Sequence, residues 1–174
     1  MAESFLNLLR WIQATPGSTG IRESTWTYPV IESVHVLGLC LFLGFALIWD
    51  MRLLNKAFRR VPVSDIQARV MPWVNVGFII MVISGSLLFY EEPVRFYGNI
   101  FFRLKIVALL LAGLNALIFH FFTSGKRLVE WDSSPISPRS AKVAGYVSIF
   151  LWMCIVVFGR FIAYNWFDPL VPQQ

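Results

Sequence analysis

The sequence predicts an all-α fold: an integral membrane four-helix bundle with a short N-terminal interfacial amphipathic helix, in one membrane domain over residues 1–174. The first observation is composition, because 57% of the 174 residues are hydrophobic and only 14% are charged, unlike a soluble domain. The second is arrangement, because four apolar stretches approach the roughly 20 residues that a membrane-crossing helix needs. This composition argues against a soluble enzyme and leaves no room for a separate extramembrane domain.

The first predicted element is a helix over about residues 4–14 that lies in the membrane interface. Phe5, Leu8, Leu9 and Ile12 recur at helical spacing, which is typical of an amphipathic helix with one apolar face. The segment Thr-Pro-Gly-Ser-Thr-Gly at 15–20 is expected to end this helix, because proline and glycine are strong helix breakers.

The first two predicted spans cover about residues 28–49 and 72–90. The first has Pro29 in its opening turn, where a proline is tolerated. A basic connection over residues 50–71 is expected to lie at one membrane surface. The second span contains Gly77 and the run Ser84-Gly85-Ser86, small residues that let neighbouring membrane helices approach closely.

The third and fourth predicted spans cover about residues 103–122 and 143–164. A short aromatic loop precedes the third span. The segment from Asp132 to Arg139 is rich in serine and proline, which indicates a loop before the fourth span. The fourth span carries Arg160, which we expect to be buried. The tail past residue 169 is expected to be unstructured.

The distribution of basic residues predicts that both termini are outside, which in a bacterial inner membrane means the periplasm. Cytoplasmic loops carry an excess of Lys and Arg. The opposite side holds four such residues, whereas the loops over 50–71 and 123–142 hold nine: Arg52, Lys56, Arg59, Arg60, Arg69, Lys126, Arg127, Arg139 and Lys142. The net charge is +5, but these residues flank apolar segments. We therefore expect contacts with the lipid bilayer and no nucleic-acid site.

The candidate site centres on His35. Ionisable residues are costly inside a membrane and mark functional sites there, and His35 lies one helical turn from Glu32 on the same face. At 1.5 Å per residue, His35, Lys105 and Arg160 lie a few Å to about 10 Å from the outer ends of their spans, so they can share one level. Four residues are expected slightly further out in the same cluster: Glu32, whose carboxylate would neutralise a neighbouring cation, Arg103, Tyr164 and Trp26.

His120 is expected to lie apart from this cluster. Roughly 15 residues of helix separate it from Lys105, which places it about 20 Å deeper, near Asp50 at the other membrane face. The chain has only two histidines. A haem held by two histidines is therefore excluded, and any haem would take His35 as its one histidine ligand.

Three segments resemble a family of small four-helix membrane proteins. They are Glu32-Ser-Val-His35-Val-Leu-Gly38, Arg103-Leu-Lys105-Ile-Val-Ala, and Gly159-Arg160-Phe-Ile-Ala-Tyr164. Together they are similar to the haem-containing protoporphyrinogen oxidase of the HemJ type and to the membrane domain of copper resistance protein D. The resemblance implies that the positions of His35 and Lys105 hold haem b and support an oxidoreductase activity.

The first of three functional hypotheses is a haem b protein for electron transfer or redox chemistry on a quinone or porphyrin, with His35 as the metal ligand and Lys105 and Arg160 at the haem propionates. The second is copper transport or handling by soft ligands in the middle of the membrane, namely Cys40, Met81, Met153 and Cys154. In the third, the protein is a non-catalytic subunit, and His35 only ties helices together. Its partner would be another membrane protein or a second copy of itself.

Overall fold

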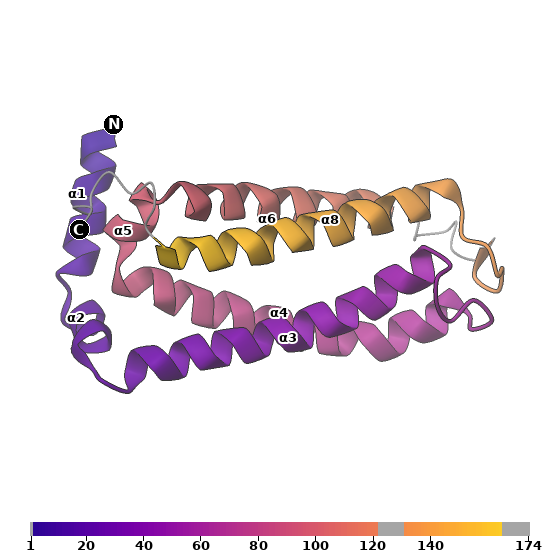
Figure 1. Ribbon diagram of the computed structural model, residues 1–174, viewed down its shortest axis with the longest axis horizontal. Helices are drawn as coiled ribbons and strands as arrows, with labels where there is room; N and C mark the ends of the chain where they lie inside the picture. The colour runs from indigo at the N-terminus through magenta and orange to yellow at the C-terminus, as the bar shows by residue number, and fades with distance from the viewer. Residues whose placement is uncertain (1, 122–130, 165–174) are drawn as a thin grey trace.

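The computed structural model describes residues 2–121 and 131–164, and within them it confirms an all-α membrane protein. Residue 122, the end of the third predicted span, and the tail past 169 lie outside the described residues. Four described helices are long and apolar enough to cross a bilayer. They are α3 (Thr27–Leu53), α4 (Val63–Glu91), α6 (Ile100–Phe119) and α8 (Arg139–Phe161), the last continued by the short 3-10 helix η2 (Ile162–Tyr164), as Figure 1 shows.

Helices α3 and α4 are longer than the sequence predicted, mainly at the end of the bundle formed by the 54–62 and 131–138 segments, hereafter the loop end. The connection predicted over 50–71 is shorter in the structure, because α3 continues to Leu53 and α4 already begins at Val63. Pro72 lies inside α4 rather than at its start. The first turns of α4 are stabilised by packing, since Val63, Ile66 and Val70 are all buried there.

The opposite end of the bundle, hereafter the amphipathic end, carries three short helices. They are α1 (Ala2–Gln13), α2 (Pro16–Glu23) and α5 (Pro93–Gly98), and α1 runs across the end of the bundle in Figure 1. The first helix matches the predicted amphipathic element: Leu9 is buried, whereas Leu8 and Trp11 are exposed. The break after it is confined to residues 14–15.

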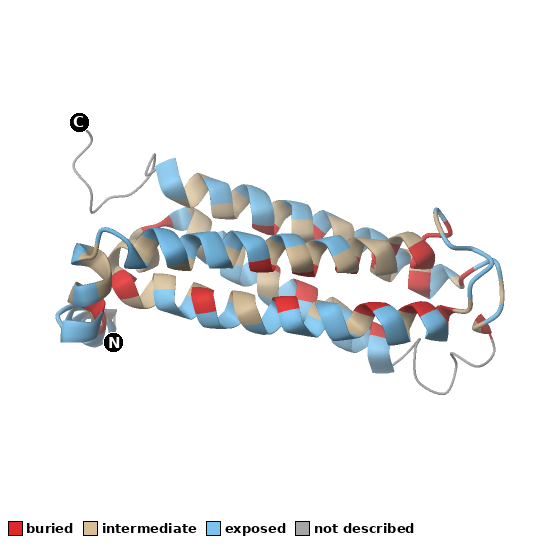
Figure 2. Ribbon diagram, turned by 90° about the horizontal axis from the view of Figure 1, so that it is seen from below, coloured by how far each residue is buried: buried red, intermediate tan, exposed pale blue. Residues whose placement is uncertain are grey.

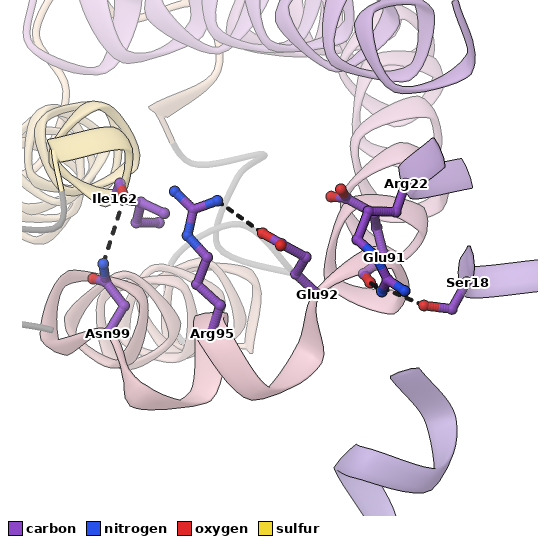
Figure 3. Close-up of polar contacts among 7 residues, drawn as sticks. All are labelled: Ser18, Arg22, Glu91, Glu92, Arg95, Asn99 and Ile162. Atoms are coloured by element: carbon purple, nitrogen blue, oxygen red, sulfur yellow. Dashed lines mark hydrogen bonds and ion pairs between the residues drawn. The ribbon is translucent and has the colours of Figure 1, made fainter. Parts of the chain in front are cut away.

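The 15–20 segment does not remain a loop as expected. Pro16 occupies the first turn of α2, where its missing N–H costs nothing. Ser18 is fully buried, and its hydroxyl donates to the Glu91 carbonyl oxygen over 2.9 Å. Arg22 donates to the same oxygen over 3.3 Å. Figure 3 shows how these contacts tie α2 to the end of α4.

The four spans pack as two pairs, α3 with α4 and α6 with α8, and α3 also contacts α8. In the first pair the backbones approach closely at Gly77, where a Cβ would lie 2.7 Å from the backbone nitrogen of Phe42. Within the described residues, α4 and α6 form no comparable interface. The bundle is therefore open along one seam.

The loop end is closed by a buried arginine. Arg52 is fully buried, and its guanidinium donates to the carbonyl oxygens of Val61 and Ser134 and to the Ser137 hydroxyl. Asn55 ends α3 with a φ of 56°, a left-handed conformation that asparagine tolerates. The Asn55 side-chain oxygen then accepts from both the backbone N–H and the hydroxyl of Ser137. In Figure 2, buried positions gather at this end.

Candidate functional site

The open seam leads into a cavity of about 1180 Å³ between the two helix pairs. All four spanning helices line it, and most of the lining is apolar and aromatic, including Phe42, Phe78, Phe89 and Trp152. This volume is slightly above the roughly 300–1,000 Å³ of ordinary small-molecule sites. The cavity therefore has room for a large hydrophobic ligand.

His35 lines this cavity from α3, and its ring is held by α4. Its Nδ1 lies 2.9 Å from the Ser84 Oγ. The Ser84 hydroxyl also donates to the Ile80 carbonyl oxygen, 2.6 Å away. In the tautomer that carries its proton on Nδ1, the imidazole donates to Ser84 and keeps the Nε2 lone pair available to a metal ion or a proton.

Close helix packing also fixes the position of this ring. A Cβ at Gly85 would lie 3.1 Å from the His35 Cε1, so a larger residue at position 85 would push the imidazole away. The sequence predicted only that Ser84 and Gly85 are small residues that allow close helix packing. Their role could have been recognised from the placement of a hydroxyl and a glycine side by side on the helix that follows the one carrying His35.

Lys105 lines the same cavity from α6. Its ammonium lies next to α8 at Gly159, where a Cβ would be 3.5 Å from Nζ. His35 and Lys105 are close enough to interact electrostatically, as their predicted common depth implied. Within the described part of the chain, no hydrogen-bond acceptor or carboxylate pairs with Lys105. The ammonium is thus available to an anionic group of a ligand.

The other members of the predicted cluster lie outside the cavity lining. Arg160 is exposed rather than buried, and its guanidinium lies 5.6 Å from the centre of the Tyr164 ring. Arg103 is also exposed, donates to the Tyr97 carbonyl oxygen and lies over the Tyr97 ring. The prediction that one cluster gathers all these residues was therefore wrong.

The predicted role of Glu32 was also wrong. Its side chain is exposed, and no ion pair joins it to a cation in residues 2–121 and 131–164. Periodicity placed Glu32 on the same helical face as His35, but it lies nearly a full turn closer to the amphipathic end. At that level the cavity no longer extends along this face of α3.

The soft residues of the copper hypothesis are dispersed. Met81 lines the cavity, but Cys40 and Met153 are exposed, and Cys154 is outside the cavity lining. No group of three or more His, Cys, Asp or Glu side chains among the described residues is placed to share a metal ion.

A second polar group lies at the loop end of the cavity. Asp50 and His120 both line it there, with Asn115 and Ser148 between the helices. His120 and His35 are thus at opposite ends, in agreement with the depth argument. The Asp50 Oδ2 accepts a 2.7 Å hydrogen bond from the Ser148 hydroxyl.

Comparison with known proteins gives a family but no activity. No curated protein and no solved structure matches the chain. A family model does match over residues 16–165, and it describes a family of unknown function (DUF6644). Because this match takes in all four spanning helices, the chain belongs to the DUF6644 family.

Proposed function

We propose that this protein is an integral membrane haem b protein that carries out electron transfer or redox chemistry on a hydrophobic partner such as a quinone or porphyrin. One observation carries the proposal. An imidazole with its Nδ1 held by Ser84 lies at the same end of the apolar cavity as the Lys105 ammonium, which has no partner among the described residues. The sequence resemblance to haem-containing oxidases favours the same two positions.

The residues present fit such a group. His35 would bind the haem iron through Nε2, and Ser84 would orient the imidazole, as hydrogen-bonded neighbours of metal-binding histidines generally do. Lys105 would pair with a propionate. Arg160 is outside the cavity lining, so Lys105 alone is proposed for that role. When bound, haem would supply one-electron chemistry.

The protein itself would bury the bound group and leave it accessible to a hydrophobic partner. Apolar side chains along the cavity exclude water from the region between His35 and the loop end. The seam between α4 and α6 opens sideways, so a hydrophobic partner would reach the cavity directly from the bilayer. The soft-ligand alternative gains no comparable support, because Cys40 and Met153 are exposed.

The visible spectrum of the protein purified in mild detergent tests the proposal. We expect a Soret band that shifts on reduction with dithionite. His35→Ala should abolish the band in a folded protein, and Lys105→Ala should weaken haem retention. His120→Ala is the matched control and should leave the spectrum unchanged. A band that survives His35→Ala, or protein that never binds added haem, would refute the proposal.

We also propose that the loop end faces the cytoplasm of a bacterial inner membrane, with the amphipathic end in the periplasm. The excess of Lys and Arg at the loop end supports this orientation. The test uses single cysteines at two exposed positions, Glu23 and Ser133, in a chain with Cys40 and Cys154 replaced by alanine. An impermeant thiol reagent added to intact spheroplasts should label position 23 only. Labelling of position 133 alone would show the opposite orientation.

A further inference from the structure

The loop end of the cavity holds a buried carboxyl group that the proposed redox site does not use. Asp50 is only 3% exposed, and it lines the cavity near the end of α3. Its one described side-chain partner is the Ser148 hydroxyl on α8, 2.7 Å from Oδ2. A carboxyl inside a membrane bundle is a candidate functional group by default.

No counter-ion accompanies this carboxyl among the described residues. Arg52 is two residues away, but its guanidinium is occupied by Val61, Ser134 and Ser137. Among the described residues no cation lies within ion-pair distance of Asp50. An ionised carboxylate without a partner is costly to bury, so with no cation beside it among the described residues, we expect Asp50 either to hold a proton or to contact water when it is ionised.

The surroundings of Asp50 in the cavity are polar. The titratable side chains among the described cavity residues are His35, Lys105, Asp50 and His120. His120, on α6, is the one that shares the loop end with Asp50. The other polar side chains that line this end are uncharged and come from α4, α6 and α8: Gln67, Asn75, Asn115 and Ser148.

We propose that Asp50 is a proton-binding site that exchanges a proton with water entering the loop end of the cavity. In the protonated form, the proton sits on Oδ1 and Oδ2 keeps its hydrogen bond from Ser148. On release, the proton passes to water, the carboxylate keeps the same hydrogen bond, and no electrons move. The site is independent of the proposed haem, since it lies about 22 Å of helix away from His35.

Infrared difference spectroscopy on the purified full chain tests this proposal with or without pigment. Above roughly pH 6, exposed carboxyl groups are ionised, so between about pH 6 and pH 9 we expect a carboxylic-acid C=O band from Asp50 that is lost as the pH rises, distinct from any band of Glu91, which is also buried. Asp50→Asn should remove this band. Ser148→Ala should keep it but move it to higher frequency, because one hydrogen bond to the carbonyl oxygen is lost.

The matched control is Asp132→Asn, which changes a carboxyl in the 131–138 segment and should leave the band unchanged. Circular dichroism confirms that each variant is folded, and the Ser148→Ala shift identifies the group even if Asp50→Asn does not fold. A wild-type protein with no pH-dependent carboxylic band would overturn the proposal. So would a band that persists in folded Asp50→Asn, or one that Na⁺ removes at constant pH.

Discussion

The loop end and the cavity are built from the same four helices, yet their buried polar groups differ in how completely they are hydrogen-bonded. At the loop end, Arg52 and Ser137 are fully engaged by backbone and side-chain oxygens. In the cavity, Lys105 has no partner among the described residues, and Asp50 has only a hydroxyl. The difference indicates that the loop end contributes stability, whereas the cavity keeps polar groups available for a ligand or a proton.

The largest expected effect is at the loop end. Arg52→Ala removes three hydrogen bonds from a fully buried guanidinium and leaves their acceptors unpaired. Each buried acceptor left unpaired costs about 1–3 kcal/mol, so we expect a loss of roughly 3–5 kcal/mol in the free energy of unfolding, measured by thermal unfolding in mild detergent. Arg60→Ala is the matched control, because Arg60 is exposed. Equal stability of the two variants would remove the distinction between the two regions.

Alanine substitutions at two glycines compare the packing between α3 and α4 with the packing around the cavity. Gly77→Ala places a Cβ 2.7 Å from the Phe42 backbone nitrogen, so α3 and α4 must move apart at a cost of about 1–3 kcal/mol. Gly113 lines the cavity, and nothing lies within 4 Å of its Cβ position. Gly113→Ala should therefore be neutral or should stabilise by up to about 1 kcal/mol. The melting temperature should fall for Gly77→Ala and should stay the same or rise for Gly113→Ala. A fall for both variants would show that the cavity closes around α6.

A smaller effect is expected for Asn115→Ala in the cavity wall. The Asn115 side-chain nitrogen donates to the Ala144 carbonyl oxygen over 3.0 Å and so joins α6 to α8. Interhelical hydrogen bonds in membranes contribute about 0.6 kcal/mol on average, and we expect a loss of this size in the same assay. Ser86→Ala should cost less, because Ser86 bonds only within its own helix. A loss at Asn115 as large as that at Arg52 would contradict the comparison.

The smallest effect concerns pH and Asp132. The backbone N–H and hydroxyl of Ser64 both donate to the Asp132 carboxylate over 2.7 Å, and the backbone hydrogen bond is the main reason that the pKa of Asp132 is lowered. A lowered pKa in the folded state contributes stability above the unfolded value of about 3.9, and this stability is lost as the pH falls through the folded value. Asp132 is near the surface, so the contribution is small.

Asp132→Asn tests this linkage. The difference in melting temperature between wild type and variant should be greatest near neutral pH and should vanish in acid, once the pH is below the lowered pKa of Asp132. Asp65→Asn, on the same helix turn as Ser64, is the control for a general charge effect. A difference that grows towards acid pH would mean that the carboxylate destabilises the fold.

The sequence by itself determined the four spanning helices, the amphipathic helix before them, and the common depth of His35 and Lys105. Length, hydropathy and the fixed rise of a helix are enough for these inferences. The same reasoning separated His120 from His35. It did not locate the ends of α3 and α4, because the buried loop-end contacts of Leu53 and Val63 extend those helices.

Only the tertiary structure decided which side of each helix faces the cavity. Lipid is as apolar as the interior of the bundle, so a spanning helix lacks the polar-outside, apolar-inside pattern that orients helices in water. Arg160 and Lys105 were therefore equivalent in the sequence, and packing placed the first outside and the second inside. The hydrogen bond that fixes His35 through Ser84 joins residues 49 positions apart, and this pairing depends on how α3 and α4 align.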